Sequence, residues 1–399
     1  MIVINIKKAL INPLFLFLAI WITVFTLFSL CISETFIPLK EEFLLCIGAT
    51  GLSAIVGHTC SYFSLLCRHQ QKSSQIANKT LSLGFIKLLF CFICITFITE
   101  VIVFDGVPLI WVFIGVSKSY FDYGIPTLHG FFNAVLIFEG TICFWVIVTK
   151  KPSSLVWIIF LSCIIIPILA ISRQVVTSLL VQCFFVFIGT RYKYLHLKKG
   201  QILLFVGVIF VLFSVLGIIR TNSESLRNYS ALKPEYEWMP TEMLWPYMYL
   251  TTPLNNFVNL TSSSFDNTWG YSSVSKFTPT VIRQTLQQIF WSNMILNTPP
   301  PVVRNFNVST YASILYTDFG WIGVIIFTFL IILMSSKVFH RFTKYNSLYD
   351  LLLLSIFNQM IVFSFFDNLF LLLGVSFQLF LVIMFRKNMV NVFATSNHA

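Results

Sequence analysis

Ten apolar runs dominate this chain, and each is long enough to cross the hydrocarbon core of a bilayer as a helix, which takes about 20 residues for about 30 Å. Polar connections separate them. The runs lie near 9–31, 43–66, 81–103, 128–149, 154–172, 174–190, 201–219, 312–334, 350–366 and 369–385. With 57% apolar and only 10% charged residues, the chain does not have the composition of a soluble domain. The sequence therefore predicts an all-α, polytopic integral membrane protein with about ten transmembrane helices.

One polar stretch, 220–311, interrupts this series of spans and so divides the chain into three parts. Residues 1–219 are expected to form a first membrane bundle of about seven spans, and 312–399 a second segment of about three spans with a short tail. The stretch carries eight of the 14 prolines and four of the nine tryptophans, which is not the composition of a flexible linker. After Pro279 it has the period of an amphipathic helix. We expect a large, partly helical loop that folds back on the membrane surface.

The distribution of charge predicts the orientation of the spans. Alternate connections hold sixteen basic residues against the single acid Asp350, and the other connections hold thirteen of the fifteen acids. Because cytoplasmic loops collect Lys and Arg, this pattern places both termini in the cytoplasm and the large loop outside. The net charge of +11 is then a topology signal, and a nucleic-acid partner is not expected.

The sequence contains no motif for a metal or a nucleotide. D-x-D, H-E-x-x-H and the phosphate-binding glycine loop are all missing. The nine cysteines lie in or beside the apolar runs and none lies in the large loop, so that loop is not expected to contain disulfides. We therefore expect neither a cofactor nor a metal ion.

Five arginines on the outward side are the most specific candidates for a binding site. They are Arg173, Arg220, Arg227, Arg283 and Arg304. Basic residues are disfavoured on this side, and a guanidinium grips phosphate oxygens with paired donors. Together they predict a pyrophosphate site, in which Arg173 and Arg220 at the membrane edge are the strongest candidates. The alternative is that each arginine pairs with a lipid phosphate or a neighbouring acid.

Candidates for acid–base chemistry and for sugar binding lie on the same side. Four acids lie near the outer ends of spans, namely Glu100, Asp105, Asp318 and Asp367, and one of them could serve as the general base for a sugar hydroxyl, with His129 as a rival. An ion pair or a helix cap is the alternative role for each acid. The large loop is rich in aromatic residues, including Trp245 and Tyr249, whose rings would cover the C–H faces of a sugar. A belt at the level of the lipid headgroups is the alternative role for these aromatics.

Several short segments resemble the bacterial O-antigen polymerase (Wzy) family. They are Gly124-Ile-Pro-Thr-Leu-His-Gly130, Ser172-Arg173 at a tight outer turn, Arg220 at the start of the large loop, Tyr249-Leu-Thr-Thr-Pro-Leu-Asn-Asn256 and Ser309-Thr-Tyr-Ala-Ser-Ile-Leu-Tyr-Thr-Asp-Phe-Gly-Trp-Ile-Gly323. The order of these segments covers most of the chain, although each motif is short.

This resemblance implies a glycosyltransferase with a fold similar to the GT-C class, in the bacterial inner membrane, with its active site facing the periplasm. The donor would be a growing glycan on undecaprenyl pyrophosphate and the acceptor one lipid-linked repeat unit. Membrane lipids and a polysaccharide chain-length regulator would be its other partners. Arg173 and Arg220 would hold the pyrophosphate. An O-antigen ligase, or a flippase for lipid-linked oligosaccharides, is the alternative function.

Overall fold

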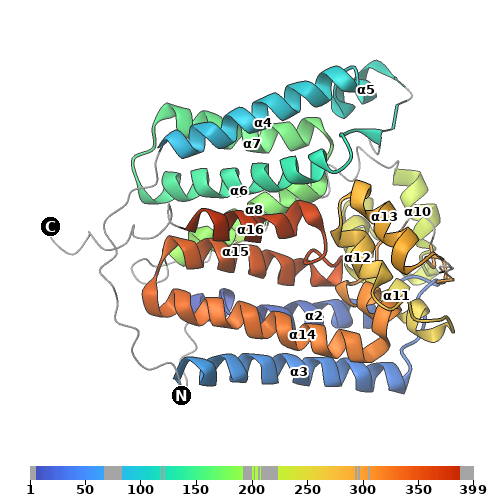
Figure 1. The fold of residues 1–399 in the computed structure, drawn as a ribbon. Coiled ribbons are helices and arrows are strands. Elements are labelled where there is room, and N and C mark those ends of the chain that lie inside the picture. Colours follow the sequence, from blue (N-terminus) through green and yellow to red (C-terminus); the bar gives the residue numbers. More distant parts are fainter. Residues whose placement is uncertain are drawn as a thin grey trace.

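The computed structural model is a bundle of roughly parallel helices (Figure 1). It describes residues 6–66, 83–116, 118–119, 122–191, 200–201, 203–204, 207, 223–292, 294, 297–303 and 306–386. This part of the chain is helical and contains no strand, which confirms the all-α prediction. Nine of the ten predicted spans coincide with helices, and most of the run at 201–219 lies outside the described residues.

Nine of the apolar runs form long helices, and the short helix α1 precedes the first of them. They are α1 (Ile6–Leu10), α2 (Pro13–Ser29), α3 (Glu41–Leu66), α4 (Leu83–Val103), α6 (Leu128–Thr149), α7 (Ser154–Leu169), α8 (Arg173–Thr190), α14 (Tyr311–Tyr345), α15 (Leu348–Val362) and α16 (Leu373–Met384). Shorter elements lie between them, namely α5 (Pro108–Ile114), α10 (Ser223–Ser230), the 3-10 turns Pro234–Tyr236 and Phe363–Phe365, α11 (Thr241–Ser262), α12 (Tyr271–Phe277) and α13 (Thr280–Phe290).

Six helical stretches of the described chain are long and apolar enough to cross a membrane. They are Glu41–Ser64, Leu83–Ile114, Leu128–Thr149, Arg173–Thr190, Tyr311–Tyr345 and Leu348–Phe365. The helices α2, α7 and α16 are apolar but shorter. The structure thus supports a membrane protein with several spans.

The helices that follow the large loop lie among those that precede it. The helix α14 packs on α3 and on α15, α15 packs on α8, and α16 packs on α6 (Figure 1). The helices α4 and α7 cover the other side of α6. The described parts of 1–219 and 312–399, which are separate in the sequence, therefore build one bundle.

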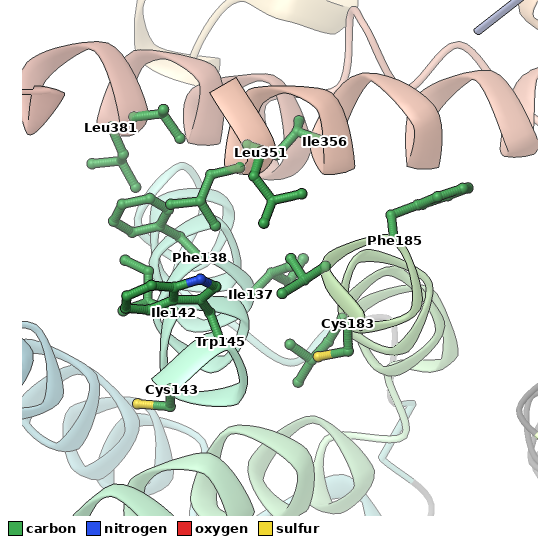
Figure 2. Packing of buried hydrophobic residues seen from close by; sticks show 14 of the residues in the cluster. Ile137, Phe138, Ile142, Cys143, Trp145, Cys183, Phe185, Leu351, Ile356 and Leu381 are labelled. Atoms are coloured by element: carbon green, nitrogen blue, oxygen red, sulfur yellow. The ribbon is translucent and has the colours of Figure 1, made fainter. Parts of the chain in front are cut away.

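The centre of this bundle is a close-packed apolar core. Trp145 and Phe138 of α6 belong to the same cluster as aliphatic side chains of α15 and α16. Cys183 and Phe185 come from α8, which lies beside α6 (Figure 2). Inside a membrane such packing stabilises helix contacts through van der Waals contact, because lipid tails are as apolar as the side chains.

Four amide and hydroxyl side chains interrupt the apolar core and link its helices. Gln182 of α8 donates its amide to Gln359 of α15 (3.2 Å) and to Gln378 of α16 (2.9 Å), and accepts from Thr141 of α6 (3.0 Å). All four side chains are buried. Each such bond between transmembrane helices contributes about 0.6 kcal/mol, so this network fixes which helices meet.

The segments of the large loop gather at one end of the bundle, which we call the loop end (Figure 1). Two asparagines of α11 hold them in place. Asn255 exchanges hydrogen bonds with the backbone of Thr35 and Ile37, at 3.0 and 2.9 Å. Asn256 binds backbone groups of Val302, Phe306 and Val308. The described part of the loop is thus folded, as its proline and tryptophan content predicts.

Candidate functional site

Arg173 is the first residue of α8 and lies at the loop end, directly after the tight turn from α7. Its Nη2 donates a hydrogen bond of 3.1 Å to the Tyr249 hydroxyl. The guanidinium carbon lies 5.8 Å from the centre of the Trp245 ring and 5.4 Å from that of Tyr249. The sequence predicted all three residues for the substrate site, and the fold brings them into contact.

The environment of Arg173 is unusual for a cation. Positive charge at a helix N-terminus is unfavourable by about 0.3–1 kcal/mol, because the backbone amides there already carry partial positive charge. Contact with aromatic faces stabilises a guanidinium by about 0.5–2 kcal/mol, which offsets this cost. Arg173 is only 8% exposed. A helix N-terminus and a guanidinium at one buried point together favour an anion.

The aromatic partners of Arg173 belong to a larger ring cluster. Trp245 and Tyr249 are four residues apart on α11, so they share one face of the helix, with ring centres 5.0 Å apart. Tyr249 also stacks on Phe366 at 5.7 Å and meets the edge of Phe306 at 6.1 Å. The rings of Trp245 and Tyr249 thus lie against the guanidinium.

His129 lies in the first turn of α6 and pairs with a buried carboxylate of α4. Its Nδ1 is 3.0 Å from each carboxylate oxygen of Glu100, which is fully buried. The backbone amide of Ile125 donates to the same carboxylate at 3.2 Å. Burial and the charge of Glu100 raise the pKa of the neighbouring Tyr123, which stays a neutral phenol.

Gly124 makes room for His129. Its φ of +106° lies in a region that favours glycine, and a Cβ there would lie 2.5 Å from Cγ of the imidazole. The Gly124–Gly130 segment therefore begins with a residue that allows the histidine ring to lie over the backbone.

Asp318 has a different environment, in the helix α14. Its carboxylate accepts from the backbone amides of Ser272 and Ser273, at 2.9 and 2.8 Å, and from the hydroxyls of Thr268 and Ser273. It is fully buried. Because four donors surround it at the start of α12, Asp318 fastens the loop to α14. The α14 backbone bends just beyond, at Gly320, where φ is +62°.

The other predicted site residues lie apart from Arg173. Arg227 of α10 donates to the backbone oxygens of Glu237 and Met239, at 3.1 and 2.8 Å. Arg283 of α13 donates to the oxygen of Thr278 at 3.3 Å. Arg220 and Arg304 lie outside the described residues, so their predicted roles stay predictions.

No protein-family model, curated protein or solved structure matches this chain. The functional argument therefore depends on its own residues.

Sequence reasoning missed two pairs at the loop end. It noted Glu100 as an acid near the end of a span but did not pair it with His129, which follows 29 positions later. It also missed the ion pair between Lys276 of α12 and Asp367, which precedes α16. A buried acid predicts some partner, but only the packing of α4 on α6 identifies it.

Proposed function

We propose that this chain is a glycosyltransferase of the O-antigen polymerase type, which transfers a growing glycan from undecaprenyl pyrophosphate to a lipid-linked repeat unit. The reaction would take place at the periplasmic face of a bacterial inner membrane. The observation that carries the proposal is the contact of buried Arg173, at the start of α8, with Trp245 and Tyr249 of the large loop.

The chemistry of this contact fits a pyrophosphate leaving group. As the bond from the sugar C1 to the phosphate oxygen breaks, negative charge develops on the pyrophosphate. A guanidinium and the N-terminus of α8 stabilise that charge, and the gain is largest when water is excluded. Arg173 meets this condition because aromatic side chains cover it.

The aromatic cluster fits the sugar that carries the leaving group. Trp245 and Tyr249 present apolar ring faces to C–H groups, while the Tyr249 hydroxyl supplies a polar edge. A glycan that displaces these rings from Arg173 would bring its own phosphate to the guanidinium.

Deletion of the gene, followed by complementation, tests this function through the ladder of surface polysaccharide. Loss of a polymerase leaves one repeat unit on the surface lipid, loss of a ligase leaves none, and loss of a flippase traps repeat units inside the cell. We expect the first pattern in the deletion strain and in a strain that carries Arg173→Ala.

A matched control is Arg191→Ala at the other end of α8, where the guanidinium lies over the Phe187 ring at 3.8 Å. We expect this variant to restore the full ladder. Arg173→Lys keeps the charge but loses the paired donors, so it should restore the ladder only in part. A full ladder in the Arg173→Ala strain, at normal protein abundance, excludes the assignment of Arg173.

A further inference from the structure

The pair formed by His129 and Glu100 leaves one ring nitrogen uncommitted. Where Glu100 is ionised, its oxygens can only accept hydrogen bonds, so Nδ1 of His129 then carries the hydrogen that Glu100 binds. In the neutral imidazole, Nε2 then holds a lone pair. Within the described residues Nε2 has no hydrogen-bond partner, and the side chain is 24% exposed.

Burying the carboxylate of Glu100 costs free energy, and hydrogen bonds to it reduce that cost. A fully buried carboxylate is expensive unless it is paired, and here the imidazole and the amide of Ile125 are its partners. A histidine that served only to fill the core would be buried on both ring nitrogens. Here Nδ1 binds the buried carboxylate, while the side chain as a whole is 24% exposed.

The pair lies close to the turn that positions Arg173. The Tyr123 ring meets the edge of the imidazole with centres 5.9 Å apart. Tyr123 also belongs to the apolar cluster that includes Leu169 and Ala170 at the end of α7. Arg173 begins α8 three residues later. Tyr123 thus connects the imidazole to the end of α7, and Arg173 follows that end in the sequence.

We infer that His129 is the general base for the acceptor hydroxyl, and that Glu100 is the positioning residue that keeps the Nε2 lone pair toward the substrate. This inference rests on the proposed function. In the reaction, Nε2 takes the proton of the acceptor hydroxyl while its oxygen bonds to C1 of the donor sugar. The bond from C1 to the phosphate oxygen breaks, the pyrophosphate leaves with the electron pair beside Arg173, and the imidazolium later releases its proton to water.

Variants of His129 test the base directly, in membranes of the deletion strain supplied with lipid-linked repeat units. General-base catalysis contributes about 10²–10⁴-fold, so His129→Gln and His129→Ala should slow chain growth by that factor at normal abundance. Added imidazole should restore growth to His129→Ala, and substituted imidazoles of similar size should restore it in the order of their basicity. If His129 served only in packing, the recovery of chain growth would not depend on the basicity of the added imidazole.

His58→Gln is the matched control for the loss of an imidazole. His58 of α3 is half-buried and its Nδ1 bonds the Ser336 hydroxyl at 2.8 Å, and no carboxylate among the described residues pairs with it. We expect this variant to extend glycans at the wild-type rate.

Variants of Glu100 test the positioning role. Glu100→Gln should lower the rate at saturating acceptor, leave the half-saturating acceptor concentration unchanged, and gain nothing from added imidazole. In ¹⁵N spectra of histidine-labelled protein, Glu100→Leu should convert the fixed Nδ1–H tautomer of His129 into a mixture.

The outcomes separate the two proposals. If the deletion strain keeps its full ladder, the proposed function fails and the assignment of a base fails with it. If deletion abolishes the ladder but His129→Gln extends glycans at the wild-type rate, only the base assignment is overturned. An unchanged tautomer in Glu100→Leu overturns the role of Glu100 alone.

Discussion

Two buried carboxylates at the loop end differ in how their oxygens are used. Asp318 accepts from two backbone amides and two hydroxyls at the start of α12, so its oxygens are saturated by neutral donors. Glu100 directs both oxygens to one imidazole and accepts from one backbone amide, that of Ile125, and the other nitrogen of the ring has no hydrogen-bond partner among the described residues. The first arrangement holds a helix in place, whereas the second prepares a side chain for proton transfer. Burial alone therefore does not identify a catalytic acid.

The largest effect that this comparison predicts is on stability, at Asp318. Asp318→Ala leaves the part-buried amides of Ser272 and Ser273 and the buried hydroxyl of Thr268 without their acceptor, and each buried donor left unsatisfied costs about 1–3 kcal/mol. We expect a lower free energy of unfolding in detergent and faster proteolysis of the loop near α12. Chemical denaturation and limited proteolysis measure both.

The exposed acid Asp266 in the same loop supplies the control for Asp318. Asp266→Asn removes a charge from the same segment without a buried partner, so its stability should match the wild type. A wild-type unfolding curve for Asp318→Ala would contradict the fastening role and return Asp318 to the candidate bases.

The second prediction concerns the pair of Glu100 with His129, which a substitution at Gly124 should disrupt. Gly124→Ala introduces backbone strain of about 1–3 kcal/mol and a methyl group 2.5 Å from Cγ of His129. We expect the imidazole to leave Glu100, with loss of chain growth greater than the loss of stability. Gly115→Ala is the control, because Gly115 also has a positive φ of 72° but open space around its Cβ. Equal glycan lengths in the two variants would show that the position of His129 is unimportant.

The sequence was sufficient to predict the helices but not their neighbours. Apolar length identified where the long helices lie, since an apolar run of about 20 residues is a local property of the sequence. The placement of α15 and α16 among α6 and α8 follows from long-range contacts such as Gln182 with Gln359 and Gln378, 177 and 196 positions apart. Local patterns carry no signal for such pairings.

The candidate site was predicted in part for the same reason. Arg173 was recognisable alone, because a cation at the outer edge of a span needs an explanation, and Trp245 and Tyr249 were recognisable as loop aromatics. Their mutual contact was not predictable, since it depends on how α11 lies against α8. Only the packed structure shows that Glu100 pairs with His129. The same is true of Asp318, which fastens the loop to α14.

The smallest effect should come from the second polar contact of α12, the ion pair of Lys276 with Asp367. Both side chains are partly exposed, and such pairs contribute about 0–1 kcal/mol because solvent screens them. We expect Lys276→Ala to leave the unfolding curve almost unchanged. The double variant that carries both Asp318→Ala and Lys276→Ala should have the same free energy of unfolding as Asp318→Ala alone. The measurement is denaturation of the four proteins of this cycle in one detergent. If Lys276→Ala destabilised the protein as much as Asp318→Ala does, α12 would be held by charge pairing at the bundle end. Asp318 would then not be needed to hold α12 in place. The difference drawn here between a structural role for Asp318 and a positioning role for Glu100 would no longer be supported.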